Sequence, residues 1–338
     1  MSWPRLSWSH LVWPTSVLIA IMTVCMGLVI VMIRVGVMDV PGHRSSHARP
    51  TPKGGGIGIM AGFLLGVPAL YWAAGFSPAS FAVTAPLTAI GLLALFSWLD
   101  DVHSFSAASK LGMQFGAALI VLVATQWPAN TPHIWLYASI ALFWLLYVTN
   151  AINFIDGVNG LASGSMALTA LAAASGFMIV DRLDDALAPL ALAACLLVFL
   201  PFNFPTARIF MGDVGSQGAG LATAWFGLRA FQHTATPLLM PLMLLPILYD
   251  VGFTLIRRAL EGRRLTEAHR GHLYQLAVRA GASPVRVTLL YWFLALWNAI
   301  ATLTIQTWPL LAVAIAVPLA LWTLGVLRQA SRTVSRPW

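Results

Sequence analysis

The sequence predicts an all-α, polytopic membrane protein with about eleven transmembrane helices. Hydrophobic residues make up 59% of its 338 residues and charged residues only 9%, whereas a soluble domain carries about 25% charged residues. The apolar residues gather in eleven runs, most of them close to the roughly 20 residues that a helix needs to cross a bilayer. No polar stretch is long enough to fold alone, so residues 1–338 are expected to form a single membrane-embedded domain.

The eleven runs are separated by shorter polar loops. The first run is longer than the core of a signal peptide and has no convincing small-residue cleavage site, so it is expected to be retained as a span. Two runs are short, and the count depends most on them. Cys25 and Cys195 lie inside apolar runs, which predicts buried thiols and no disulfide framework. The expected spans are 11–33, 56–77, 80–99, 109–127, 133–149, 160–180, 186–201, 216–231, 237–256, 287–306 and 309–327.

Lys and Arg are distributed unevenly between the two alternating sets of loops. One set holds only Arg5, Arg182 and Arg229 of the 19 basic residues. Cytoplasmic loops are enriched in Lys and Arg, so the N-terminus is expected on the outer, periplasmic side of the membrane and the C-terminus in the cytoplasm. The formal charge of +8 then reflects this bias and contact with anionic membrane lipids, and no nucleic-acid partner is implied. The other set holds Arg34, Arg44, Arg49, Lys53, Lys110, Arg208, Arg257, Arg258, Arg263, Arg264, Arg270, Arg279, Arg286, Arg328, Arg332 and Arg336.

Acidic residues recur at the expected cytoplasmic ends of the spans. Ionisable groups near a membrane are costly and are candidates for function by default. Several carboxylates that converge near Lys and Arg indicate a site for a hard cation and a phosphate, since Mg²⁺ prefers a few carboxylates together with phosphate oxygens. Mn²⁺ is a possible substitute. The acids in question are Asp100, Asp101, Asp156, Asp213 and Asp250.

Two stretches near the N-terminus carry this pattern. In "RSSHARPTPKGGGIGI", basic residues that include Lys53 lead into a glycine triplet that opens a helix, and backbone N–H groups at such an end can hold an anion. The alternative is a charged flank followed by a turn. In "WLDDVHSFSAASKLGMQ", Asp100 and Asp101 end one span and Lys110 begins the next. Adjacent carboxylates repel unless a cation or proton intervenes; the alternative is a solvated helix end.

A third stretch, "NAINFIDGVNGLASG", repeats polar residues every three positions. Asn150, Asn153, Asp156 and Asn159 would share roughly one helix face. Such amides and a carboxylate could read a nucleobase or complete a metal site. The alternative is a polar loop with an Asx turn.

Two further stretches lie between the later spans. In "FNFPTARIFMGDVGSQGAG", Arg208 and Asp213 stand among glycines that would let the backbone approach a phosphate. The loop "RRALEGRRLTEAHRGHLYQ" offers His269, Arg270 and His272 to an anionic ligand, or is an ordinary positive cytoplasmic loop. No third His or Cys follows at zinc-ligand spacing.

Together these stretches resemble the polyprenyl-phosphate N-acetylhexosamine-1-phosphate transferases of glycosyltransferase family 4. The motifs "LDD" with Lys110 downstream, "NxxNxxDGxxG" and "FMGDVGS" match in order and spacing across about residues 44–275. The family includes the phospho-N-acetylmuramoyl-pentapeptide transferases and the initiators of O-antigen and teichoic acid, and eleven spans with "AHRGHLYQ" look more like the initiators. Two departures stand out: Asn159 replaces a frequent family Asp, and only His272 of an HxHH-like cluster is kept.

The resemblance implies a Mg²⁺-dependent transfer of a HexNAc 1-phosphate from a UDP-sugar to undecaprenyl phosphate at the cytoplasmic face, with release of UMP. It would initiate a lipid-linked surface glycan such as O-antigen; the sugar (GlcNAc, GalNAc, QuiNAc or FucNAc) and a homodimer are left open. Asp213, with Asp156, would hold the metal, Lys110 would neutralise phosphate charge, and Asp100 or Asp101 would orient or deprotonate the lipid phosphate. The expected substrate-binding residues are Lys53, Asn150, Asn153, Asp156, Arg208, His269, Arg270 and His272.

Two other classes of function share some of these features. A transporter or lipid flippase also carries intramembrane acids and broken helices, but its acids would lie near the midplane, and no paired halves repeat in this sequence. A non-catalytic membrane scaffold would not need the motifs in this order. Release of UMP from a UDP-HexNAc and undecaprenyl phosphate separates the enzyme from both.

The charge distribution and the odd number of spans predict a cytoplasmic C-terminal tail, "RQASRTVSRPW". A reporter that is active only in the periplasm is expected to stay silent when it is fused to Trp338. The same reporter inserted in the loop "DRLDD" is the positive control. Activity of the C-terminal fusion would mean that a span has been miscounted.

Overall fold

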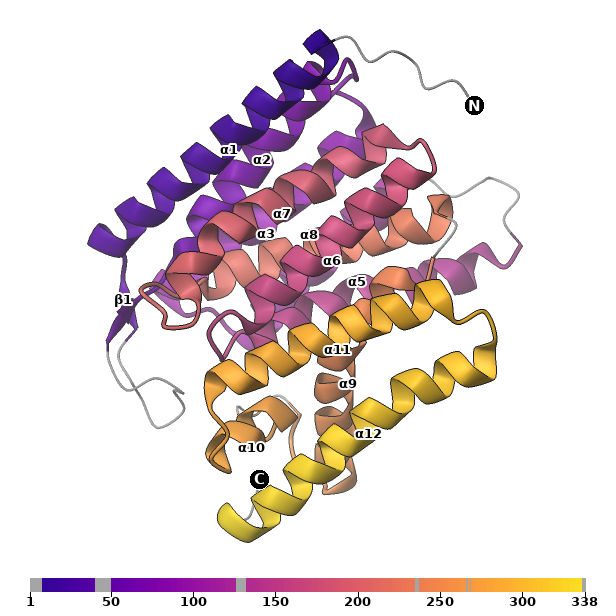
Figure 1. The fold of residues 1–338 in the computed structure, drawn as a ribbon. Coiled ribbons are helices and arrows are strands. Elements are labelled where there is room, and N and C mark those ends of the chain that lie inside the picture. The colour runs from indigo at the N-terminus through magenta and orange to yellow at the C-terminus, as the bar shows by residue number, and fades with distance from the viewer. Residues whose placement is uncertain are drawn as a thin grey trace.

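The computed structural model describes residues 8–39, 50–125, 132–234, 237–265, 267 and 269–335 and confirms an all-α architecture. The described residues form twelve helices and a two-stranded antiparallel sheet (Figure 1). Arg5, Arg44, Arg49 and Arg336 of the predicted charge pattern lie outside the described residues. The elements are α1 (Trp8–Val35), β1 (Met38–Asp39), β2 (Thr51–Pro52), α2 (Gly55–Ala73), α3 (Phe81–His103), α4 (Ala107–Ala124), α5 (Ile134–Ile155), α6 (Leu161–Ile179), α7 (Leu183–Asn203), α8 (Gly212–His233), α9 (Leu239–Leu260), α10 (Leu273–Arg279), α11 (Pro284–Thr304) and α12 (Trp308–Thr333).

The long helices match the expected spans one by one, with some shifted ends. Among the described residues, ten helices are long and apolar enough to cross a membrane. The eleventh long helix, α8, has 22 residues but is less apolar. Helix α5 continues six residues beyond the expected 133–149, so Asn150 and Asn153 lie on it. The short helix α10 was not predicted, because seven residues are too few to show a hydrophobic period.

Helix α8 runs through the centre of the bundle (Figure 1). Every residue from Val214 to Leu228 is buried, and the helix packs against α2, α3, α5 and α6. A helix that is buried on all sides does not need an apolar surface for lipid. Its polar residues are therefore shielded by protein instead of facing the bilayer.

Glycines on α2 let this helix approach its neighbours closely. Gly58, Gly62 and Gly66 recur every four residues and face α1, where a Cβ at Gly58 would lie 2.8 Å from the carbonyl oxygen of Cys25. Small residues at this spacing are typical of close helix packing in membranes. Cys25 and Cys195 are both buried and free, as the sequence predicted.

The segments that lead into α2 and α8 are joined by backbone hydrogen bonds. The Phe210 N–H donates to Pro52 O at 2.8 Å, and the N–H groups of Gly55 and Gly56 donate to Phe210 O and Met211 O at 2.9 Å each. These bonds occupy two of the glycine-triplet donors that could otherwise hold an anion, which agrees with the alternative interpretation of this stretch as a charged flank and a turn. The glycines of the triplet and of "GDVGS" instead allow backbone-to-backbone packing of α2 on α8.

The opposite end of the bundle carries an ion-pair cluster. Asp185 on α7 is paired with Arg229 on α8 and with Arg182, which lies 2.7 Å away. The Tyr71 hydroxyl donates to Asp184 O. The cluster therefore ties α7 to α8, and the neighbouring Asp184 ties α7 to α2, far from the joined segments.

The start of α1 and the end of α12 lie at opposite ends of the bundle (Figure 1). This is the arrangement expected for an odd number of crossings. Which end faces the cytoplasm stays a prediction from the charges.

The contact between Gly56 and Gly215 gives a test of the α2–α8 packing. A Cβ at Gly56 would overlap the backbone nitrogen of Gly215, so we expect Gly56→Ala to lower stability by about 1–3 kcal/mol. Thermal unfolding of the purified protein in detergent is the measurement. Gly112→Ala is the matched control, because a Cβ there meets nothing within 4 Å. Equal melting temperatures for both variants would contradict the tight packing.

Candidate active site

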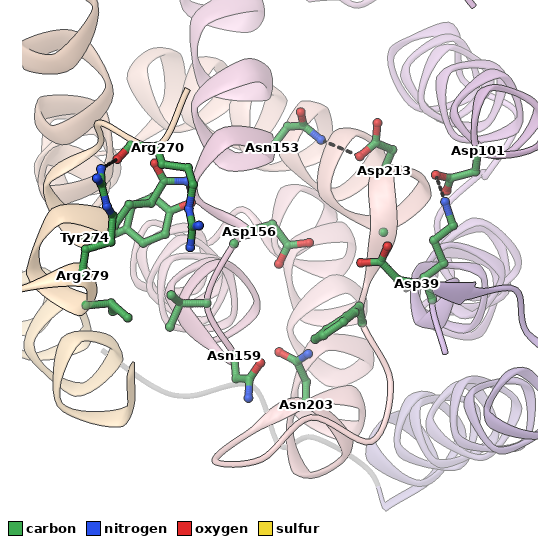
Figure 2. A pocket seen from close by; sticks show the side chains of 17 residues that line it. Asp39, Asp101, Asn153, Asp156, Asn159, Asn203, Asp213, Arg270, Tyr274 and Arg279 are labelled. Atoms are coloured by element: carbon green, nitrogen blue, oxygen red, sulfur yellow. Dashed lines mark hydrogen bonds and ion pairs between the residues drawn. The ribbon is translucent and has the colours of Figure 1, made fainter. Parts of the chain in front are cut away.

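A cavity of about 360 Å³ opens where α3, α5, α8 and α10 meet (Figure 2). Six of the predicted catalytic and substrate-binding residues line it: Lys53, Asp101, Asn153, Asp156, Asp213 and Arg270. The predictions did not include Asp39, Asn203, Tyr274, Gln275 or Arg279. The charged lining residues are Asp39, Lys53, Asp101, Asp156, Asp213, Arg270 and Arg279, and the amide-bearing ones are Asn153, Asn159, Asn203 and Gln275.

Asp213 lies in the first turn of α8 and faces α5 across the cavity. Asn153 donates one amide N–H to Asp213 Oδ1 at 3.1 Å and its amide also contacts Ser216 Oγ at 2.9 Å. Asp213 and Ser216 share a face of α8 because they are three residues apart. A direct side-chain contact thus joins "NAIN" on α5 to "MGDVGS" on α8.

Asp156 caps the C-terminal end of α5 and lines the same cavity. Burial raises the pKa of Asp156 well above its usual range, and the charge of Asp213 raises it further. Two carboxylates that face one cavity repel each other when both are ionised. A cation placed between them would remove that repulsion.

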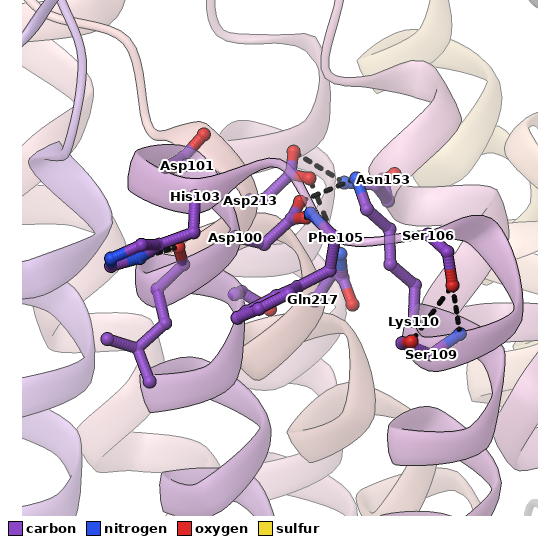
Figure 3. Close-up of polar contacts among 12 residues, drawn as sticks. Asp100, Asp101, His103, Phe105, Ser106, Ser109, Lys110, Asn153, Asp213 and Gln217 are labelled. Carbon is purple, nitrogen blue, oxygen red and sulfur yellow. Dashed lines mark hydrogen bonds and ion pairs between the residues drawn. The ribbon is translucent and has the colours of Figure 1, made fainter.

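The side chains of the two adjacent acids at the end of α3 point in different directions (Figure 3) and take different partners. Asp101 Oδ1 accepts from Lys53 Nζ at 2.8 Å and lines the cavity. Asp100 is buried, pairs with Lys110 through Oδ2 and accepts from the Phe105 N–H at 2.7 Å through Oδ1. Neighbouring residues on a helix do not face the same way, so the pair does not act as one bidentate unit.

Both lysines are placed by local structure. Ser106 caps α4 by accepting from the Ser109 N–H at 3.1 Å, which fixes the turn that carries Lys110. Lys53 precedes α2 in the segment that pairs with Phe210. Burial by itself would lower the pKa of Lys53, but the hydrogen bond and the charge of Asp101 outweigh it and the pKa is raised. Lys53 therefore stays a cation beside Asp101.

The wall opposite Lys53 is formed by α10 and the residues before it (Figure 2). Asp250, fully buried on α9, accepts from the N–H groups of Leu273 and Tyr274 at 2.7 and 3.0 Å and from the Tyr291 hydroxyl. We had grouped Asp250 with the candidate metal acids, but its position gives it the role of an anchor for α10. The anchored helix presents Gln275 and Arg279 to the cavity.

Tyr274 joins this wall to the turn that carries Asp156. Its hydroxyl donates to Phe154 O at 2.9 Å and accepts from Gln275 Nε2 at 3.1 Å. A Cβ at Gly157 would overlap that hydroxyl, so only glycine fits there. Burial raises the pKa of Tyr274, with the charge of Asp250 adding to it, and the residue stays neutral.

Four predicted substrate-binding residues do not line the cavity. His272 is buried beside Asp250, with 3.5 Å between Nδ1 and Oδ1. Burial, followed by the charges of His272 and nearby arginines, lowers the pKa of His269 to about 4, so His269 is neutral near pH 7. Arg208 is exposed with its guanidinium over the Phe202 ring. Asn150 donates to Gln114 Oε1 at 2.9 Å, deeper in the bundle.

Comparisons with known proteins show the family to which this chain belongs. The family model for glycosyl transferase family 4 matches residues 83–231. A decaprenyl-phosphate N-acetylglucosaminephosphotransferase of Mycolicibacterium smegmatis is 32% identical, over 91% of this chain and 86% of that protein. A probable undecaprenyl-phosphate N-acetylglucosaminyl 1-phosphate transferase of Bacillus subtilis is 27% identical, over 82% and 79%. A phospho-N-acetylmuramoyl-pentapeptide-transferase of Moorella thermoacetica is 30% identical, over 79% and 88%.

The fold and these matches together define a polytopic membrane transferase. The chain belongs to glycosyl transferase family 4, as the three motifs predicted.

The ion pair between Lys110 and the buried Asp100 generates a test. Lys110→Ala leaves the Asp100 carboxylate, 6% exposed, without its cation, so we expect turnover to fall by roughly tenfold or more, since a hydrogen bond to a charged group contributes about 1.5–3 kcal/mol and 1.36 kcal/mol is tenfold in rate. Arg286→Ala removes an exposed cation at the start of α11 and is the control. Near-normal turnover of Lys110→Ala in a folded protein would leave Lys110 with only a topological role.

Proposed function

We propose that this protein transfers a HexNAc 1-phosphate from a UDP-sugar to undecaprenyl phosphate and releases UMP at the cytoplasmic face of a bacterial inner membrane. The product would be the first lipid-linked intermediate of a surface glycan such as O-antigen. The names of two relatives support this proposal, since they state a polyprenyl phosphate and an N-acetylglucosamine phosphate. The observation that carries it is a cavity with carboxylates at its centre and cations on two walls.

The cavity suits two anionic substrates whose phosphate groups meet inside it. Lys53 with Asp101 stands on one wall, and Arg270 and Arg279 stand on the opposite wall (Figure 2). Asp156 and Asp213 lie between these walls. Transfer of a phosphoryl group is catalysed mainly by positioning and by neutralising charge, and two cationic walls serve both substrates.

The central residues fit a magnesium ion. The described residues hold no group of three or more His, Cys, Asp and Glu side chains that could bind a metal by itself. Mg²⁺ does not need one, because it commonly takes one or two carboxylates and fills its shell with substrate phosphates and water. Asp213 and Asp156 would hold the ion, with Asn153 beside them, and the bound ion would neutralise charge on the diphosphate.

The chain's own residues account for the remaining parts of the reaction. A phosphate oxygen of the lipid attacks the phosphorus that bears the sugar, the bond from this phosphorus to the bridging oxygen breaks, and UMP leaves with that oxygen. A phosphomonoester has a second pKa near 6, so the attacking phosphate needs no strong base. We assign the orientation of the lipid phosphate to Lys53 and Asp101, and the support of that wall to the ion pair between Asp100 and Lys110.

The position of the acids also bears on the transporter alternative. Asp101 lies in the last turn of α3, Asp156 at the end of α5, and Asp213 in the first turn of α8. They gather at one end of the bundle, where a soluble and a lipid substrate can meet, and this arrangement favours the enzyme over a carrier with a midplane site.

The role proposed for Asp213 predicts that Asp213→Asn loses at least about a hundredfold in UMP release, since charge stabilisation by a metal supplies several kcal/mol and 1.36 kcal/mol is tenfold. Purified protein is assayed with a UDP-HexNAc, undecaprenyl phosphate and Mg²⁺. Wild-type activity should vanish with EDTA and return with Mg²⁺ or Mn²⁺.

Asp181→Asn is the matched control for this experiment. Asp181 is exposed, far from the cavity in the loop before α7, and has a positive φ of 57° that Asn tolerates. Normal turnover of Asp213→Asn at low Mg²⁺ would place the metal elsewhere, with Asp101 the next candidate. No UMP release by the wild type would overturn the proposed reaction itself.

A further inference from the structure

A chain of three amide side chains crosses the interior of the bundle and ends on Asp213. Gln114 on α4 and Gln217 on α8 are only 6% and 4% exposed. Burying an amide in apolar surroundings is costly unless hydrogen bonds replace those to water. Their presence in otherwise apolar helices therefore calls for a partner network, and the structure contains one.

The links of this network are direct hydrogen bonds. Asn150 Nδ2 contacts Gln114 Oε1 at 2.9 Å, and Gln114 Nε2 contacts Gln217 Oε1 at 3.0 Å. Gln217 Nε2 then reaches Asp213 Oδ2 at 3.5 Å (Figure 3). The other oxygen of Asp213 accepts from Asn153. Each carboxylate oxygen thus faces one amide donor from the protein.

The carboxylate fixes the direction of the whole chain. An ionised Asp213 can only accept hydrogen bonds, so Gln217 must turn its NH₂ group towards it. The Gln217 carbonyl then faces Gln114, and the Gln114 carbonyl faces Asn150. Three amide dipoles are aligned head to tail with their positive ends towards Asp213, and aligned hydrogen bonds of this kind strengthen one another.

Helix spacing explains why these positions are polar. Gln217 follows Asp213 by four residues on α8, and Asn150 precedes Asn153 by three on α5, so each pair shares a face. Gln114 follows Lys110 by four residues on α4. One face of α4 therefore supports Asp100 through Lys110 and Asp213 through Gln114.

We propose that Gln217, Gln114 and Asn150 are positioning residues that hold the Asp213 carboxylate in its metal-binding orientation. This inference rests on the proposed function, in which Asp213 binds Mg²⁺. Partners that orient a metal ligand typically contribute 10–100-fold to metal affinity or activity. The proposal gives Asn150 a role behind the site, whereas the sequence suggested contact with substrate.

The test uses Gln217→Met, Gln114→Met and the double variant in the full-length protein, purified in detergent. Methionine keeps the unbranched shape but cannot donate. Mn²⁺ binding without substrates, followed by the electron paramagnetic resonance signal of free Mn²⁺, is the first readout, and UMP release against Mg²⁺ concentration is the second. Thr223→Val is the control, because Thr223 is a buried polar residue of the same helix whose hydroxyl donates to Ala219 O, one turn earlier on α8.

We expect Gln217→Met to weaken Mn²⁺ binding about tenfold. Gln114→Met should also weaken Mn²⁺ binding, but by a smaller factor, and Thr223→Val should bind Mn²⁺ as the wild type does. The double variant should match Gln217→Met, since removal of one link already breaks the chain. A higher Mg²⁺ concentration should restore most of the turnover, which a folding defect would not allow. If Gln217→Met does not fold, Gln114→Met carries the test, because it does not touch Asp213.

Wild-type Mn²⁺ affinity and wild-type Mg²⁺ dependence in both single variants would overturn the positioning role, even where Asp213→Asn is inactive. If the losses of Mn²⁺ affinity in the two single variants multiply in the double variant, the two glutamines act independently, and the claim that the amide chain acts as a unit is overturned. An active Asp213→Asn would overturn the proposed function of the site together with this inference, and the two failures are thereby distinguished.

Discussion

The backbone pairing between the segments before α2 and α8 is the constraint on which the site depends. Three hydrogen bonds link residues 52–56 to residues 210–211, although more than 150 positions separate them in the sequence. This pairing places Lys53 beside Asp101 and brings Asp213 to the same cavity. Glycine is required there because a side chain at Gly56 would separate the two backbones. The position of the site's acids and cations follows from this contact.

A second, independent anchor fixes the other wall. Asp250 binds two N–H groups at the start of α10, and Tyr274 links α10 to the turn that bears Asp156. The cavity thus lies between two rigid units, each held by buried polar contacts rather than by apolar packing alone. Such contacts have a fixed geometry, which suits a reaction that proceeds by positioning.

The sequence predicted the helices well, because the length of an apolar run is a local property. It also identified the acids that meet in the cavity, because each lies in a short polar motif between apolar runs. The sequence could not predict which partner each of two adjacent residues would take. Asp100 and Asp101 are adjacent, yet α4 supplies a cation to one and the segment before α2 supplies a cation to the other. Asp250 could not be told apart from the other acids by sequence, because its partners are backbone N–H groups of a helix more than 20 residues away. Asp39, Gln275 and Arg279 were missed because only tertiary contacts bring them to the cavity. Amides such as Gln217 could have been found, because a polar residue within an apolar stretch of sequence indicates a buried hydrogen-bond partner.

The polar content of α8 has a consequence for how the protein enters its membrane. The residues that serve the site make α8 a poor transmembrane segment by itself, since charged and amide groups oppose partition into lipid. Its partner α7 is strongly apolar, and Asp185 neutralises Arg229 at their shared end. Helix α8 packs mainly against α2, α3, α5 and α6, which precede it in the chain, and these helices provide the polar and apolar contacts that lipid would not. Among the long helices that the structure describes, α8 is in this sense the one that depends most on its neighbours for its place in the membrane.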